Sequence, residues 1–344
     1  MKKPLKQLAL ESFVAISLCV SFFFFMLPVV MAPRYYDNNS TNAYLFTHIS
    51  KYPVQTKEDY ENEFPVFAAR MGPRLLTGAL WNCMVDLTIK NHGTGVYTWN
   101  GYNFNLLSIA FGTYQAGWLA LLFGLLIRYR PDAVLIMLGT FSGLMYNFNI
   151  PAGSWCYPWD MPSLALFTWA ILISKEYYPL IAVAFVASLI KETGATCALL
   201  VLLGPWSWRK RIGGFVGLIL AFVISRKLLM ACGNVQTIFL PFAESTSLFS
   251  FIGNSFKLFL DNMKALFSFH LNSPFFSNCG MLFIMFFLPA RMQIKLTAAA
   301  FFIGQLMFGI IFEFRIWYEL LPLGMMQLSD YLKTCQPAPA KQKA

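Results

Sequence analysis

Charged residues are scarce in this chain. Asp, Glu, Lys and Arg together make up 12% of its 344 residues, whereas hydrophobic residues make up 57%. A typical soluble domain carries about twice that charged fraction. Apolar runs of membrane-spanning length recur from one end of the sequence to the other. The composition therefore predicts an all-α fold, a polytopic helical membrane protein.

Several motifs that would indicate a specific chemistry are also missing. No G-x-G-x-x-G, P-loop or G-x-S-x-G sequence occurs, which argues against a nucleotide-driven pump and a serine hydrolase. The seven cysteines include no C-x-x-C pair, and the three histidines show no ligand spacing, so no metal site is predicted. We expect no cofactor, although the sequence leaves a divalent-metal requirement open. The absence of an internal repeat gives no support to an inverted-repeat transporter.

The net charge of +10 is best explained by the membrane itself. Cytoplasmic loops of membrane proteins carry an excess of Lys and Arg, and no basic block lies on a soluble domain, so nucleic acid is not an expected partner. The basic start followed by the apolar run 13–31 predicts an uncleaved first span. We expect a multi-pass protein of a bacterial inner (plasma) membrane with both termini in the cytoplasm.

The predicted organisation is one transmembrane domain over residues 1–344 with about ten spans. The first outer-face segment, 33–102, contains an amphipathic stretch at 72–87 that is typical of an interfacial helix. A second outer-face segment, 233–278, is also amphipathic in part, and 334–344 is a disordered tail. The predicted spans are 13–31, 104–127, 133–150, 161–174, 180–190, 195–206, 213–232, 280–288, 296–312 and 316–331.

The stretch 179–206 is the most informative part of the sequence. As a single helix it would place Lys191 and Glu192 near its middle. Inserting each ion into the membrane at that depth costs about 2.5–3.5 kcal/mol of free energy. A hairpin that turns at KETG avoids this cost. Each arm would then measure about 18 Å, short of a hydrocarbon core of about 30 Å. Such short arms are tolerated only when protein or a water-filled cavity surrounds their ends.

This topology places charged residues from separate parts of the chain on the outer face. Asp37 follows the first span, and Asp160 lies at a helix start in YPWD. Each carboxylate is a candidate catalytic group, because a base within hydrogen-bond reach can take a proton from an acceptor hydroxyl. The competing interpretation for both is a helix cap.

The candidate substrate-binding residues are mostly cationic. Arg70 and Arg74 are four residues apart, so in a helix their guanidinium groups would share a face and suit a phosphate. Headgroup snorkelling explains them equally well. Lys191 and Glu192 could pair with each other or with Arg315 and hold helices together, or Lys191 could bind a phosphate in a substrate site. The same two interpretations apply to Glu313 and Arg315 in FEFRIWYEL.

These motifs together resemble the GT-C class of integral-membrane glycosyltransferases. The resemblance rests on YYDNNSTNAY, ARMGPRLL, the YPWDMPSL turn with SLIKETG, and FEFRIWYELLPL. It implies that the sugar donor is a polyprenyl-phosphate-linked sugar, which enters the site laterally from the membrane lipid. It also implies that the acceptor is a glycan, a lipid or a protein on the non-cytoplasmic face. It also implies that Asp37 is the base and that Arg70, Arg74, Lys191 and Arg315 hold the donor phosphate. The chain lacks the acidic doublet of many members, because Asn38 follows Asp37.

Two other functions remain open. A lipid-linked polysaccharide polymerase or ligase of the cell envelope would use the same face but depend on arginines rather than on Asp37. A lipid-linked-sugar flippase or a membrane assembly subunit would show no turnover, and its charged residues would serve transport or stability.

Overall fold

The computed structural model describes residues 3–30, 97–99, 102–104, 106–148, 159–232, 248–267, 287–308 and 318–335. Their regular structure is helical, apart from the three-residue strands β1 (Tyr97–Trp99) and β2 (Tyr102–Phe104), which pair antiparallel with Trp99 opposite Tyr102. The helix α1 spans Leu5–Val30, and α7 (Leu106–Tyr129) and α8 (Ala133–Phe148) follow the strands. The all-α class predicted from composition is confirmed.

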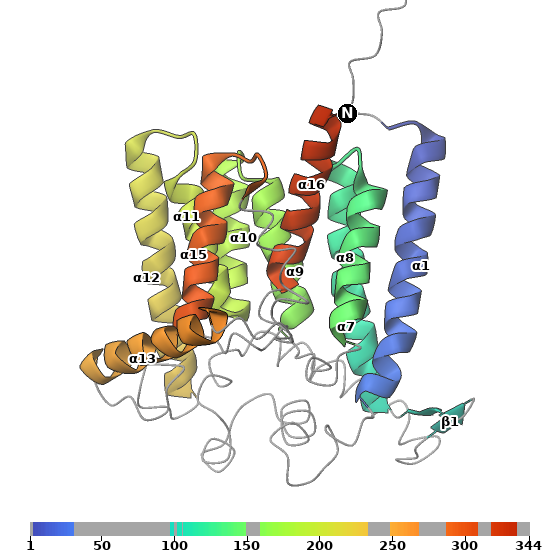
Figure 1. Cartoon of the computed structure of the whole chain (residues 1–344), viewed down its shortest axis with the longest axis horizontal. Coiled ribbons are helices and arrows are strands. Elements are labelled where there is room, and N and C mark those ends of the chain that lie inside the picture. Colours follow the sequence, from blue (N-terminus) through green and yellow to red (C-terminus); the bar gives the residue numbers. More distant parts are fainter. Residues whose placement is uncertain are drawn as a thin grey trace, which may run out of the picture.

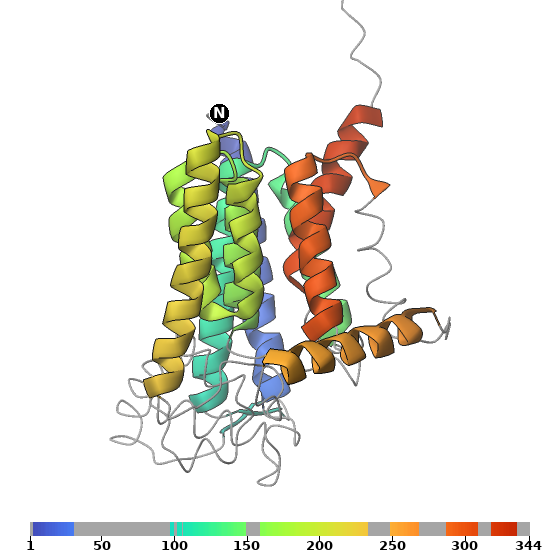
Figure 2. The same ribbon diagram turned by 90° about the vertical axis from the view of Figure 1, so that its left-hand side faces the viewer.

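The remaining helices come from the second half of the chain. They are α9 (Asp160–Leu172), α10 (Tyr177–Ile190), the 3₁₀ helix η1 (Glu192–Thr196), α11 (Cys197–Leu202), α12 (Trp208–Cys232), α13 (Leu248–Phe267), α15 (Met292–Phe308) and α16 (Leu321–Cys335). Most lie side by side with nearly parallel axes, and α13 crosses one end of them (Figures 1 and 2). In the bundle α7 packs between α1 and α9, α16 packs on α8, and α15 contacts α11 and α13.

The chain reverses between α10 and α11, as the sequence predicts. α10 ends at Ile190, Lys191 is extended, and η1 leads back into α11. The reversal is tight, because a Cβ added to Gly194 would lie 2.2 Å from the backbone carbonyl of Ala187. The start of α10 is correspondingly next to the start of α12, where the Tyr177 hydroxyl donates to the Lys210 carbonyl at 2.8 Å.

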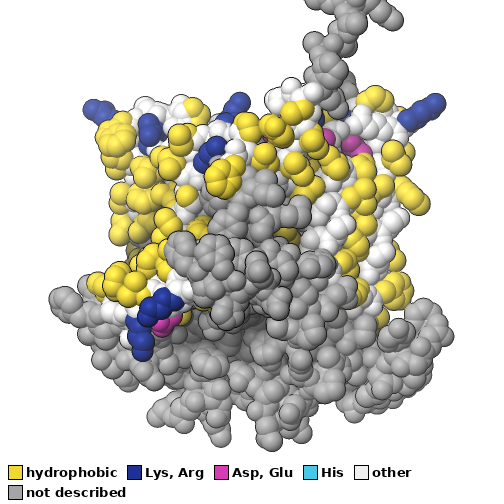
Figure 3. Space-filling model, in the orientation of Figure 1, with side chains coloured by type: hydrophobic (Ala, Val, Ile, Leu, Met, Phe, Trp, Pro, Cys, Tyr) yellow, Lys and Arg dark blue, Asp and Glu magenta, His cyan; other side chains and the backbone are white. Residues whose placement is uncertain are grey.

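We call the end with the N-terminus the basic end and the opposite one, where α10 turns into η1, the reversal end. Among the described residues, most lysines and arginines lie at the basic end, along the top of Figure 3, whereas Lys257 and Lys264 of α13 are exposed at the reversal end. Those at the basic end are Lys3, Lys6, Arg128, Arg130, Lys175, Arg209, Lys210, Arg211, Arg291, Lys295 and Lys333.

The outer surface of the helices is rich in exposed apolar side chains, which cover much of the described surface in Figure 3. Phe13 is 69% exposed, Leu220 is 55% exposed and Ile224 is 56% exposed, each in the middle part of a long helix. By length and composition, one described helix, Leu5–Leu27 within α1, is sufficient to cross a membrane alone. The other apolar helices detected in the described residues have 10–17 residues.

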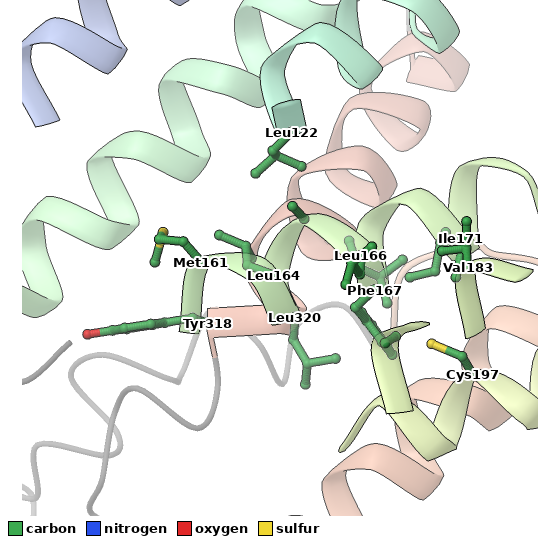
Figure 4. Packing of buried hydrophobic residues seen from close by; sticks show 14 of the residues in the cluster. Leu122, Met161, Leu164, Leu166, Phe167, Ile171, Val183, Cys197, Tyr318 and Leu320 are labelled. Carbon is green, nitrogen blue, oxygen red and sulfur yellow. The ribbon is translucent and has the colours of Figure 1, made fainter. Parts of the chain in front are cut away.

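The core is built around α9, which contacts α7, α10, α11 and α16. Phe167 of α9 contacts Phe301 of α15, with ring centroids 5.3 Å apart. Figure 4 shows Met161 of α9 beside Tyr318, which begins the 3₁₀ turn 318–320 ahead of α16. Both residues are 1% exposed. This packing brings the start of α9 against the segment that precedes α16.

α13 is amphipathic, as expected for part of the segment 233–278. Its Ser255 and Asn262 are buried, and the Asn262 side-chain amide donates to the Leu306 carbonyl of α15 at 2.8 Å. A neighbouring face exposes apolar side chains, and another exposes Lys and Asp. The exposed apolar residues are Ile252, Phe256 and Leu260. The predicted interfacial helix at 72–87 and most of the predicted span 280–288 lie outside the described residues.

Candidate functional site: a buried Asp–Lys–Glu cluster

Charged side chains from three separate elements meet inside the reversal end. Asp160 begins α9, Lys191 occupies the break between α10 and η1, and Glu319 lies in the turn that precedes α16. Their side chains are 1%, 6% and 1% exposed, respectively. Charged groups are rarely this buried unless they pair or serve a function. We call these three residues, with Ser163 and Thr193, the buried cluster.

The backbone at Lys191 explains how an ionised side chain reaches this position. Lys191 is extended, with φ −151° and ψ 150°, so helical geometry stops there. Its N–H still bonds to the Ala187 carbonyl at 3.1 Å, and its carbonyl accepts from the Gly194 N–H at 2.9 Å. The side chain thereby points into the protein instead of continuing the helical pattern of α10.

Three donors converge on one oxygen of Glu319. Its Oε1 accepts from Lys191 Nζ at 2.8 Å and from the hydroxyls of Ser163 and Thr193 at 3.0 Å each. Lys191 Nζ also lies 3.9 Å from Asp160 Oδ1. The other oxygen, Glu319 Oε2, is buried and has no hydrogen-bond partner among the residues that the structure describes. The two oxygens of this carboxylate are therefore in very different environments.

The ionised cluster has an excess of negative charge, because Asp160 and Glu319 share one ammonium group. In a low-dielectric interior, a carboxylate is stabilised by charged partners and by hydrogen-bond donors. The arrangement can accept a proton or a hydrogen bond from a further group. It is poorly suited to an incoming anion, which would approach two carboxylates.

The structure brings together two of the predicted site residues, Asp160 and Lys191. The backbone of Glu192 begins η1, but its side chain lies outside the described part of the structure. Asp37, Arg70, Arg74, Glu313 and Arg315 also lie outside the described residues. Their proximity to the buried cluster remains a prediction.

The structure bears on two interpretations of these residues. The cap residue of α9 is Trp159 and not Asp160, and Trp159 makes no side-chain capping hydrogen bond. Asp160 is instead the first helical residue, near the positive end of the helix dipole. Lys191 and Glu192 were expected to pair with each other or with Arg315. The structure shows Lys191 paired with Glu319 and near Asp160, whereas the Glu192 side chain and Arg315 lie outside its described part.

Sequence reasoning missed Glu319, Ser163 and Thr193. Glu319 follows Glu313 and Arg315 in the same short motif, and it falls inside the predicted span 316–331. An acidic residue within an apolar span is itself a signal of pairing or function. Ser163 and Thr193 give no comparable signal, because isolated hydroxyl residues are common in helices of this kind.

A second polar network joins the connection between α7 and α8 to α16 at the basic end. Arg130 bonds to Asp132 at 2.9 Å and also binds Asp330. Asp132 further accepts from Ser329 and pairs with Lys333 at 3.1 Å. Burial alone would raise the pKa of Asp132, but the hydrogen bonds from Arg130, Ser329 and Lys333 hold that pKa well below its ordinary value. This network fastens α16 to the bundle.

Comparisons with protein-family models, with curated proteins and with solved structures find no match for this chain. Within the described residues there is also no group of three or more His, Cys, Asp or Glu side chains that could hold a metal ion. The case for a function therefore depends on the buried cluster and on the exterior of the bundle.

Proposed function

We propose that the chain is a polytopic membrane protein with the basic end in the cytoplasm. The apolar exterior of the helices would contact lipid, and the Lys and Arg at the basic end agree with the positive-inside rule. The short arm α10 packs on α9 and α12, and the short arm α11 packs on α9, α12 and α15, which agrees with the need of short membrane segments for protein contacts. The reversal end then faces the non-cytoplasmic side.

We further propose that this protein is a membrane glycosyltransferase that uses a polyprenyl-phosphate-linked sugar. The observation that carries this proposal is the buried Asp160–Lys191–Glu319 cluster at the reversal end. Transfer to a hydroxyl needs a carboxylate that accepts its proton and a water-poor environment in which charges act strongly. A cluster with excess negative charge inside the bundle meets both requirements.

The donor phosphate needs cations other than Lys191, because the Lys191 ammonium is engaged by Glu319 and Asp160. Arg70, Arg74 and Arg315 are the proposed phosphate ligands, since guanidinium groups bind phosphate oxygens in pairs. Asp37 is the proposed general base. Asp160 would act beside it, either on the acceptor or by orienting Lys191.

The second candidate is a lipid-linked-sugar flippase or a membrane assembly subunit. It is favoured by one specific observation, that Lys191 and Glu319 join elements which are far apart in the sequence. A buried ion pair of this kind can hold helices in place without chemistry. A polysaccharide polymerase or ligase would share the membrane topology and the arginines.

The test is turnover by purified protein reconstituted in lipid. A panel of polyprenyl-phosphate sugars, labelled in the sugar, is supplied with and without candidate acceptors. The variants are Asp37→Asn and Asp160→Asn. The control is Asp261→Asn on α13, whose carboxylate is 56% exposed at the same end. Sugar release or transfer that both site variants abolish and the control retains would support the transferase.

Other results separate the alternatives. Turnover that survives Asp37→Asn but needs the arginines would favour the polymerase or ligase. Binding of lipid-linked sugar without turnover would favour the flippase or assembly subunit. Correct folding of each variant is checked by its elution volume and melting temperature in detergent.

A further inference from the structure

The unequal surroundings of the two Glu319 oxygens point to a ligand. Oε1 accepts three hydrogen bonds, from Lys191, Ser163 and Thr193. Oε2 is buried and has no partner among the described residues. Leaving a buried acceptor unpaired is costly, and such groups in native structures usually bond to water, a ligand or an ion. The free oxygen of a carboxylate held in one orientation is suited to receive a donor.

The charges of the cluster limit what that donor can be. A phosphate has no proton to donate at neutral pH in its ionised form and would be repelled by Asp160 and Glu319. A metal ion at Oε2 would lie close to the Lys191 ammonium, which is 2.8 Å from the other oxygen of the same carboxylate. A neutral hydroxyl donates a hydrogen bond and adds no charge. Sugars present several such hydroxyls in fixed directions.

We propose that Glu319 Oε2 accepts a hydrogen bond from a hydroxyl of the sugar ring, so that the buried cluster recognises the sugar part of the lipid-linked substrate. This inference rests on the proposed function, since it assigns the sugar part of the same substrate. Lys191, Ser163 and Thr193 are positioning residues, because they fix the carboxylate through Oε1 and leave Oε2 for the ligand. Glu319 is thereby a specificity residue that the sequence did not reveal.

The inference separates the two halves of the substrate. Loss of Glu319 Oε2 should weaken binding of the sugar hydroxyl that it contacts and leave the phosphate contacts intact. A structural role would instead weaken the binding of every ligand equally. A comparison of ligands that differ by single hydroxyls therefore distinguishes recognition from support.

The experiment measures binding of a polyprenyl-phosphate hexose, and of each of its monodeoxy analogues, to the full chain in lipid nanodiscs. Proteins compared are wild type, Glu319→Gln, Glu319→Asp and Ser163→Ala, with Asp261→Asn as control. A hydrogen bond to a charged group corresponds to an affinity change of about 10-fold or more. We expect Glu319→Gln to bind the complete hexose about 10-fold or more weakly than wild type does. For the one analogue that lacks the contacted hydroxyl, wild type and Glu319→Gln should bind equally.

Each other result has a definite meaning. Equal binding of the complete hexose by wild type and Glu319→Gln, or an equal loss for every analogue, would overturn the inference. Preference for an amino sugar that depends on Glu319 would also overturn it, in favour of an ammonium ligand. If Glu319→Gln does not fold, binding of the same analogues is measured with Glu319→Asp and Ser163→Ala, and the same comparison is made.

The binding readout is independent of turnover. Hydroxyl-selective binding through Glu319 in a protein that never transfers sugar would uphold the inference and overturn the transferase proposal. Sugar transfer with wild-type kinetics by Glu319→Gln would support the transferase proposal and overturn the inference about Glu319.

Discussion

Lys191 and Glu319 are 128 residues apart in the sequence, yet Lys191 Nζ lies 2.8 Å from Glu319 Oε1. Both side chains are almost completely buried. The pair connects the break after α10 with the turn that precedes α16. Because Asp160 is also near Lys191, a single ammonium group compensates carboxylates from two other elements.

Replacement of Lys191 should therefore be strongly destabilising. Lys191→Met leaves two buried carboxylates without a cation, and breaking a buried pair in this way costs about 3–5 kcal/mol. Lys264→Met is the control, because Lys264 is 80% exposed and its pair with Asp261 should contribute about 1 kcal/mol or less. Unfolding of the solubilised protein by denaturant measures both effects.

A double variant tests whether the cost comes from uncompensated charge. Lys191→Met combined with Glu319→Gln removes one cation and one carboxylate, so it should be more stable than Lys191→Met alone. Equal destabilisation by the single and double variants would show that the loss of packing at Lys191, and not its charge, is responsible.

The tight reversal gives a prediction at Gly194. A Cβ at this position would lie 2.2 Å from the carbonyl of Ala187, so the backbone of α10 or η1 has to move. We expect Gly194→Ala to lower the free energy of unfolding by about 1–3 kcal/mol or more. It should also weaken ligand binding at the neighbouring cluster, because Lys191 and Thr193 flank the turn.

Gly217→Ala is the matched control for Gly194→Ala. Gly217 is in α12, and nothing lies within 4 Å of a Cβ added there. The substitution should be neutral or stabilising by up to about 1 kcal/mol, since alanine favours helix more than glycine does. If both alanine variants behave alike in a melting experiment, the reversal is not as closely packed as the structure shows.

The basic-end network predicts a pH dependence of stability. The pKa of Asp132 is lowered in the folded state, so its contribution is present above its ordinary pKa of about 4 and is lost as the pH falls below that value. Asp132→Asn should lose roughly 1–3 kcal/mol at pH 7. The difference in melting temperature between wild type and Asp132→Asn should begin to shrink as the pH falls below about 4 and disappear only when the pH reaches the lowered pKa.

Asp330→Asn is the comparison for this pH series, because Asp330 is half-exposed whereas Asp132 is 10% exposed. A smaller loss at pH 7 is expected for Asp330→Asn. A difference between wild type and Asp132→Asn that persists unchanged at low pH would contradict the electrostatic origin of the effect.

The reversal between α10 and α11 was predictable because the cost of burying two adjacent charges in a long apolar helix is large. The same argument indicated that Asp160 and Lys191 lie at one end of the bundle. It could not identify Glu319 as their partner, because a contact across 128 residues leaves no trace in local periodicity. Arg315 and Glu313, four and six residues away, presented an equivalent pattern of charge.

The first residue of α9 could likewise not be predicted from the sequence. Asp160 has the residue type of a helix cap, but the helix begins at Asp160 itself and its cap is Trp159. The Asp160 carboxylate lies 3.9 Å from the Lys191 ammonium of another element, a tertiary contact that the local sequence pattern around Asp160 does not contain.

Membrane embedding can be tested on the exterior of α12. Leu220 is 55% exposed in the middle of this helix. If that surface contacts lipid, Leu220→Asp should cost about 2.5–3.5 kcal/mol on insertion and reduce the amount of protein recovered in the membrane fraction. A surface leucine facing water would tolerate the same change. Unchanged membrane recovery and stability for Leu220→Asp would argue against a lipid-facing α12.

The proposed orientation makes opposite predictions for the two ends. Cys335 is exposed at the end of α16 on the basic end, and Lys257 is exposed on α13 at the reversal end. In a background without other cysteines, Cys335 should react with a membrane-impermeant maleimide only after the cells are opened. Lys257→Cys should react in intact spheroplasts. Reaction of Cys335 from outside would reverse the orientation, and reaction of both positions from one side would exclude a membrane between them. The reversed orientation would place the buried cluster on the cytoplasmic side, where the donor would have to be reached from the inner leaflet.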